Sequence, residues 1–116
     1  MLKTIAQYLA DNTSLELGTS IWLHNIPESD IEGCVVKRIK LLQNFGTLQK
    51  TRFAIFFFHK SWTSQENLIT TVSNLFVNLY GLTDASWSIS GEVETQDYGI
   101  DEFDRYISAI FINIQH

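Results

Sequence analysis

Two stretches of this sequence are apolar on both sides of the β-strand that each one predicts, and this limits the folds open to the chain. Over Arg52–His59, one alternating set of side chains is Phe53, Ile55 and Phe57, and the other is Ala54, Phe56 and Phe58. Over Arg105–Gln115, the two sets are Ile107, Ala109 and Phe111 against Tyr106, Ile110, Ile112 and Ile114. Strands of this kind belong inside a sheet that is covered on both faces.

Residues 63–80 carry the strongest helix pattern. Thr63 and Glu66 match the S/T-x-x-E capping box, in which each side chain accepts a hydrogen bond from a free backbone N–H near the helix start. Gly81 stands where a left-handed C-terminal cap would end the helix. One apolar stripe follows at helical spacing, comprising Leu68, Val72, Leu75, Phe76 and Leu79.

The remaining patterns complete an α+β fold. Residues 2–11 predict a short amphipathic helix, and alternation or turn residues predict strands near 21–24, 34–42 and 86–95, with a turn at Asp97-Tyr98-Gly99. Pro27, just after the first strand, favours a sheet edge there. We therefore predict one domain over residues 1–116: a mostly antiparallel sheet of about five strands with two helices, in the order α-β-β-β-α-β-β.

Two helices can cover only one face of such a sheet. Burying one aromatic or branched side chain contributes ~1.5–3 kcal/mol, so a second apolar face is not expected to stay in water. Either the sheet curls and the chain covers this face itself, or a second subunit covers it. A cofactor pocket is a third, less favoured use.

Charge divides unevenly along the chain, which carries a net charge of −5. Six of its eight basic residues lie between positions 37 and 60, whereas residues 61–116 hold eight acids and one base, Arg105. This balance argues against a nucleic-acid-binding domain. It fits contact between unlike flanks of neighbouring subunits. The candidate interface pairs Lys37, Arg38, Lys40 and Arg52 with Glu92, Glu94, Asp101 and Asp104 of a neighbour.

Catalytic chemistry has little support in the sequence. His24, His59 and His116 have no metal-ligand spacing, and Cys34 reads as a small buried hydrophobe. The carboxylate cluster Asp97, Asp101, Glu102 and Asp104 lacks the calcium-loop pattern and reads as a solvated loop. We predict no enzyme activity, cofactor or metal. A small ligand-binding or hydrolytic domain that uses the 97–104 carboxylates is the alternative from another class.

A single cysteine, the lack of a signal-peptide pattern and the lack of a long apolar run predict a cytoplasmic protein without a membrane span.

Several short motifs, in order, resemble the tail-terminator and minor capsid proteins of long-tailed bacteriophages. They are Leu17-Gly18-Thr19 leading to Ile26-Pro27, the apolar strand ending at His59, Leu79-Tyr80-Gly81-Leu82, the segment Tyr98–Tyr106, and the last strand ending Phe111-Ile112-Asn113-Ile114. Ile100 and Phe103 depart from the pattern, as does the missing proline ahead of the central strand.

The resemblance implies a virion protein of the tail or neck, assembled in the host cytoplasm. Its copies would form a ring, typically a hexamer, that ends tail-tube polymerisation and joins the tail to the head connector. The implied partners are further copies, the tail-tube protein and the connector protein, and an acidic channel would let DNA pass without specific binding. A head-completion or connector role is the alternative within this class.

Overall fold

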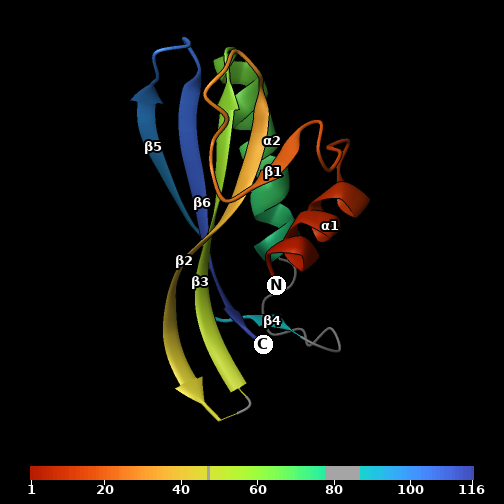
Figure 1. The fold of residues 1–116 in the computed structure, drawn as a ribbon, viewed down its shortest axis with the longest axis vertical. Coiled ribbons are helices and arrows are strands. Elements are labelled where there is room, and N and C mark those ends of the chain that lie inside the picture. Colours follow the sequence, from red (N-terminus) through yellow and green to blue (C-terminus); the bar gives the residue numbers. More distant parts are fainter. Residues whose placement is uncertain (47, 78–86) are drawn as a thin grey trace.

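The computed structural model describes residues 1–46, 48–77 and 87–116. The α+β class and the order of the expected elements are confirmed (Figure 1). The sheet has six strands instead of about five. The elements are α1 (Leu2–Asn12), β1 (Ile21–Leu23), β2 (Gly33–Phe45), β3 (Leu48–His59), α2 (Trp62–Val77), β4 (Ser88–Ile89), β5 (Glu94–Ile100) and β6 (Tyr106–Gln115).

The sheet is built around β3 and β6, the two strands that are apolar on both sides. Its order is β1-β2-β3-β6-β4, and β5 also pairs with β6. Every pair is antiparallel except β1–β2, in which Ile21 and Leu23 match Cys34 and Val36. β5 lies beside Tyr106–Phe111 and β4 beside Ile114–Gln115, so these two short strands follow one another along the same side of β6.

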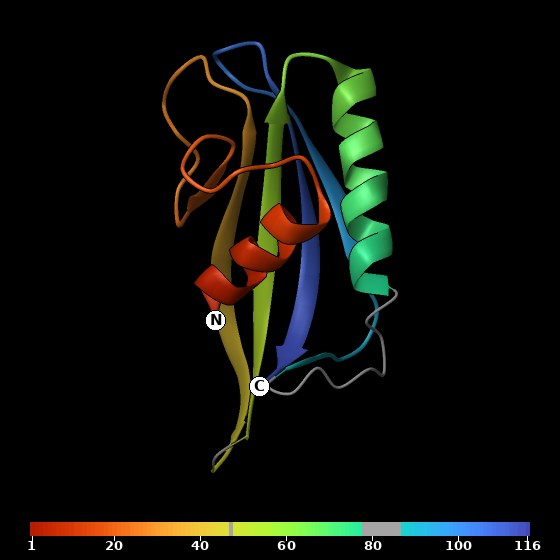
Figure 2. The same ribbon diagram turned by 90° about the vertical axis from the view of Figure 1, so that its right-hand side faces the viewer.

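Both helices lie on one face of the sheet (Figure 2). We call this the helix-covered face, and the other the helix-free face. The core lies between them and contains Ile5 and Leu9 of α1 and Val72 and Phe76 of α2, all fully buried. The sheet contributes one alternating set of side chains to this core: Cys34, Val36, Phe53, Ile55, Phe57, Ile110, Ile112 and Ile114.

The start of α2 differs from the expected capping box. The helix begins at Trp62, one residue before Thr63, and Ser61 Oγ accepts a hydrogen bond from the Ser64 N–H at 3.3 Å. Ser61 is thus the capping residue, and Thr63 lies inside the first turn. Ser61 caps the N–H of Ser64, whereas a Thr63 cap would serve the N–H of Glu66, so the helix starts two residues earlier than the capping box predicts. The expected Leu79 stripe position and the Gly81 cap lie outside the described residues.

The strand expected over 86–95 is wrong as a single element. Ser88–Ile89 and Glu94–Ile100 form separate strands, and Gly91 between them has φ +84°, which turns the backbone in a way that most residues avoid. The turn expected at 97–99 is also wrong, because these residues lie within β5 and match Ser108 and Ile107. The chain reverses direction afterwards, between Asp101 and Arg105.

β2 and β3 form a long hairpin that extends past the rest of the sheet (Figures 1 and 2). Their register runs from Gly33–Phe58 to Phe45–Leu48, with bulges at Ile39 and Leu42. This hairpin accounts for the elongated shape of the molecule, 43 × 24 × 23 Å.

Candidate assembly surfaces

The helix-free face is covered in part by the chain itself. Val35, Ala54, Phe58 and Ala109 lie on this face and have no exposed surface. The indole of Trp22 packs on Phe58, with ring centroids 5.9 Å apart. The first alternative from the sequence, coverage by the chain itself, is therefore confirmed for this part of the face.

Arg105 anchors the loops that provide this cover. Its guanidinium donates hydrogen bonds to the carbonyl oxygens of Ile31 and Pro27 at 2.9 and 3.1 Å. Its Nε donates to Asp101 Oδ2 at 2.9 Å. The group lies against the rings of Phe58 and Phe103, about 5 Å from each centroid, and Arg105 is only 2 % exposed. Three hydrogen bonds and two ring contacts thus offset the cost of burying this charge.

Hydrogen bonds fix the carboxylate of Asp101 in position to pair with Arg105. Its Oδ1 also accepts the backbone N–H groups of Phe103 and Arg105, each at 3.0 Å. Desolvation raises the pKa of Asp101, but the hydrogen bonds from Arg105 and the backbone outweigh it and lower the pKa overall. Sequence reasoning missed the Asp101–Arg105 clamp. Its one signal was that Arg105 is the sole base among the acids after residue 60.

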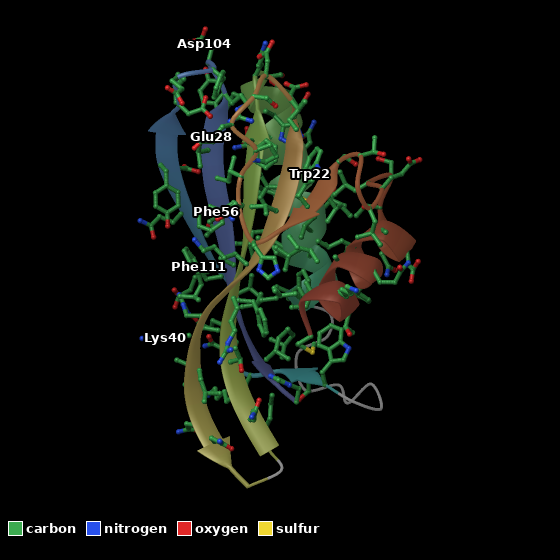
Figure 3. All side chains as sticks on the ribbon, in the orientation of Figure 1. Trp22, Glu28, Lys40, Phe56, Asp104 and Phe111 are labelled. Atoms are coloured by element: carbon green, nitrogen blue, oxygen red, sulfur yellow. The ribbon has the colours of Figure 1, made fainter. Side chains whose placement is uncertain are left out.

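Beside these buried residues, two aromatic side chains of the helix-free face remain partly open (Figure 3). Phe56 and Phe111 are half-buried and point away from the helices. Phe56 contacts the rings of Tyr98 and Phe111. Arg52 lies over the Phe111 ring at 4.8 Å and forms an ion pair with Glu94 at 2.9 Å.

Three of the eight expected interface residues are therefore engaged within their own chain. Arg52 and Glu94 were assigned to opposite sides of a subunit contact, yet they pair with each other on β3 and β5. Asp101 pairs with Arg105. Folding brings Arg52 near Glu94 because β6 alone separates their strands.

The other expected interface residues are exposed. Lys37, Arg38 and Lys40 project from β2, and within the described part of the chain they form no ion pair. Glu92 precedes β5. Asp104 lies at the tip of the clamp loop with φ +60°.

The three cations of β2 and two acids, Glu94 and Asp97, lie on two different outer margins of the sheet, with Glu92 just before β5. We define the β2 margin as Lys37–Asn44 and the β5 margin as Glu94–Ile100. Among the described residues, β2 has a strand on its outer side only at Cys34–Val36, and β5 has a strand on its β6 side only. All seven residues of β5 are exposed, and so are all residues of the β2 margin except half-buried Leu42.

Each margin also exposes large apolar side chains. Ile39 and Leu41 on the β2 margin are each 40 % exposed, and Tyr98 and Ile100 on the β5 margin are 48 % and 58 % exposed. Apolar surface that gathers along a strand with a free edge is typical of a contact with another chain.

Cys34 and the histidines have structural surroundings. Cys34 is buried, as expected, and burial raises the pKa of its thiol to about 12. His59 Nδ1 lies 2.8 Å from Gln65 Oε1, and His116 Nε2 lies 3.1 Å from Thr51 Oγ1. Over the described ranges, no three His, Cys, Asp or Glu side chains gather as metal ligands would.

Two of the four carboxylates at 97–104 already have hydrogen-bond partners in the chain, so the four do not form one free acidic site. Asp97 Oδ1 accepts a hydrogen bond from Ser108 Oγ at 2.8 Å, and Asp101 belongs to the clamp with Arg105. Glu102 and Asp104 are exposed.

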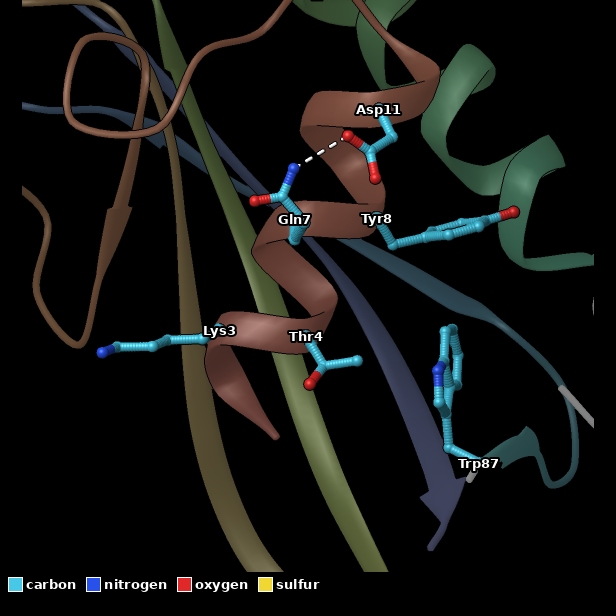
Figure 4. Close-up of a pocket in the computed structure, with 6 residues that line it drawn as sticks. All are labelled: Lys3, Thr4, Gln7, Tyr8, Asp11 and Trp87. Atoms are coloured by element: carbon cyan, nitrogen blue, oxygen red, sulfur yellow. Dashed lines mark hydrogen bonds between the residues drawn. The ribbon is translucent and has the colours of Figure 1, made fainter. Parts of the chain in front are cut away.

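Two surface hollows are candidates for a ligand site, and the second includes Lys37 of the β2 margin. One, of about 440 Å³, lies beside α1, where Tyr8 packs edge-on against Trp87 and Gln7 donates a hydrogen bond to Asp11 (Figure 4). The other, of about 540 Å³, lies on the helix-free face between residues 24–28 and Phe56. Neither lining pairs a nucleophile with a base, so neither suggests a reaction.

No helix in the described ranges has the length and apolar character that crossing a bilayer requires. No model of a known protein family matches the chain. A search of curated proteins also gives no match.

Proposed function

We propose that this protein is a structural subunit whose copies assemble head to tail into a closed ring. Following the sequence resemblance, the ring caps a phage tail tube, ends its polymerisation and joins the tail to the head connector. Six copies are the number that the resemblance implies.

The observation that carries this proposal is the chemical difference between the two margins. The β2 margin has three cations and no acid, and the β5 margin has two acids and no cation. Both acids stay exposed, although Glu94 also pairs with Arg52 and Asp97 accepts a hydrogen bond from Ser108. Each margin also exposes large apolar side chains. Surfaces that complement each other, but not themselves, form heterologous contacts, and these close into a ring when the rotation between copies allows it.

Like margins repel each other, which favours the unlike contact. A symmetric contact of two β2 margins would bring Lys37, Arg38 and Lys40 against the same cations of the partner. Like charges opposite each other across strands are destabilising. Opposite charges instead add to partner choice and association rate more than to affinity.

The hydrolytic alternative lacks a comparable observation. It needs free carboxylates at 97–104, but Asp97 and Asp101 accept hydrogen bonds from Ser108 and Arg105. A head-completion role would use the same margins, so it differs from the terminator role only in the neighbour of the ring.

Native mass spectrometry and negative-stain electron microscopy of the purified protein test the assembly. We expect closed rings of one size. Reversing the charges on one side, by K37E with K40E on the β2 margin or by E92K with E94K just before and at the start of the β5 margin, is expected to abolish them. Combining both reversals is expected to restore them. The matched control is K3E on α1, which should leave rings unchanged. Rings that survive either single-margin reversal would contradict the charge pairing.

Deleting the gene from its phage distinguishes the two virion roles. A terminator predicts tails of uncontrolled length without heads, because nothing ends tube polymerisation. Tails of normal length that fail to join filled heads would assign the protein to head completion instead.

A further inference from the structure

We infer that the margins join by main-chain pairing, with β5 of one copy added as the next strand beside β2 of a second copy. The inference rests on the proposed head-to-tail assembly and names the contact that would build it. The result would be one β-sheet continuous from copy to copy.

Both strands have an open side for such pairing. On the outer side of β2, the last backbone contact is the hydrogen bond from the His24 N–H to the Val36 carbonyl, at 3.0 Å. Along the β2 margin beyond it, the described residues provide no neighbouring strand. Among the same residues, β5 pairs only with β6. An open strand edge presents N–H and C=O groups that another chain can satisfy.

Strand direction permits the union. β2, β3, β6 and β5 alternate in direction, since each neighbouring pair is antiparallel. β5 therefore runs opposite to β2. Placing β2 of a second copy beyond β5 continues this alternation and makes an antiparallel pair, which needs no change of direction in either subunit.

The side chains favour the β5–β2 contact over the two symmetric contacts, β5 with β5 and β2 with β2. Pairing β5 with β5 would bring the carboxylates of Glu94 and Asp97 near their own copies. Pairing β2 with β2 would gather six cations at one seam. In the unlike pair, cations meet carboxylates, and Ile39 and Leu41 meet the apolar side chains of Tyr98 and Ile100.

Backbone irregularities make the edge selective. β2 has bulges at Ile39 and Leu42, and β5 has one at Tyr98. Bulges and lysines protect strand edges against indiscriminate pairing. An acidic strand can still pair with this edge, because its carboxylates would form ion pairs with those lysines.

The two margins also lie at different heights along the sheet. The β2 margin lies opposite Gln49–Ala54 of β3, whereas β5 lies across β6 from Ala54–His59. Joining them staggers successive copies. A closed sheet accommodates such a stagger when its strands tilt relative to the ring axis.

Cysteine cross-linking between two single variants tests the proposed contact of β5 in one copy with β2 in the next. Gln43 and Gln96 are exposed, uncharged, and lie on the helix-free face, since they share the alternating set of Phe56. The native Cys34 is buried, so it does not compete. Q43C and Q96C are mixed and treated with an oxidant or with a bismaleimide that spans about 8 Å, the separation of diagonal cross-strand neighbours. The control replaces Q43C with T70C on the exposed side of α2.

We expect a Q43C–Q96C product that exceeds the T70C control by on the order of tenfold or more, because contact raises the effective concentration of the thiols. A dominant Q96C–Q96C product would overturn the inference in favour of a symmetric β5 contact. Rings without the Q43C–Q96C product would overturn it while leaving the proposed function standing. Absence of both rings and product would reject both.

Discussion

The two faces of the sheet are closed by different means. On the helix-covered face, side chains of α1 and α2 interdigitate with the apolar set of β3 and β6. On the helix-free face, no helix is present among the described elements, and loops held by the buried Arg105 close one end. The first face depends on apolar contact spread over many residues. The cover of the second combines apolar packing such as Trp22 on Phe58 with loops held by one charged side chain, Arg105.

The way the two faces are covered decides which surfaces could contact another copy. The apolar surplus of β3 and β6 first suggested that a partner covers the second face. The chain instead buries Val35, Ala54, Phe58 and Ala109 by itself. Phe56 and Phe111 stay half-buried on that face, whereas the more exposed apolar side chains Ile39, Leu41, Tyr98 and Ile100 lie at the margins, so the margins are the first surfaces to test.

Removing Arg105 is expected to have the largest effect on stability. R105A leaves Asp101 and two carbonyl groups without their partner, and breaking a buried ion pair costs about 3–5 kcal/mol. The free energy of unfolding, measured by urea titration, should fall by that amount. R105K keeps the charge but not the fork of donors, and should lie between R105A and the wild type. A loss below ~1 kcal/mol in R105A would show that the loops stay closed without it.

Alanine substitutions at the neighbouring residues Ile110 and Phe111 compare the stability contributed by the two faces. Ile110 is fully buried under the helices, so I110A is expected to cost about 2–5 kcal/mol. Phe111 is larger but half-buried on the helix-free face, so F111A should cost less, on the order of 1–2 kcal/mol. Chemical denaturation of both variants measures the pair. Equal losses, or a greater loss in F111A, would contradict the proposed difference between the faces.

The acid dependence of stability should report on the clamp. The pKa of Asp101 is lowered in the folded chain, so the unfolded chain binds more protons. Its contribution to stability is therefore complete above the pKa of an unfolded aspartate, about 4. It is lost as the pH falls through the lower folded value.

D101N removes this titration. Its free energy of unfolding, measured between about pH 2 and 5, should rise less steeply with pH than that of the wild type. E102Q, an exposed neighbour in the same loop, is the control and should keep the wild-type slope. Identical slopes for D101N and the wild type would exclude Asp101 as a source of the acid dependence.

Much of the fold was predictable because its patterns are local. The stripe over 68–76 predicts α2, and the alternation in β3 and β6 predicts two central strands. The helix cap was misplaced by two residues because Ser61 and Thr63 are both acceptable caps. The expected strand over 86–95 failed because pairing with β6 and the turn at Gly91 decide where β4 ends and β5 begins.

The sequence predicted which segments are basic and which are acidic, but not which of those charges stay free of partners within the chain. The basic and acidic segments do lie on different strands, but Arg52 and Glu94 neutralise each other within one chain. Linear spacing gives no measure of that proximity, since 42 positions separate the two residues.

Local sequence determines the helices, the central strands and the sign of charge along each segment, because hydrophobic period and side-chain chemistry act over a few residues. Only the tertiary structure decides which apolar face the chain covers itself, which charges pair internally and which strand edges stay open. Those outcomes depend on sheet order and register. Both are set by contacts between residues far apart in the chain, such as Arg105 with Pro27 and Ile31.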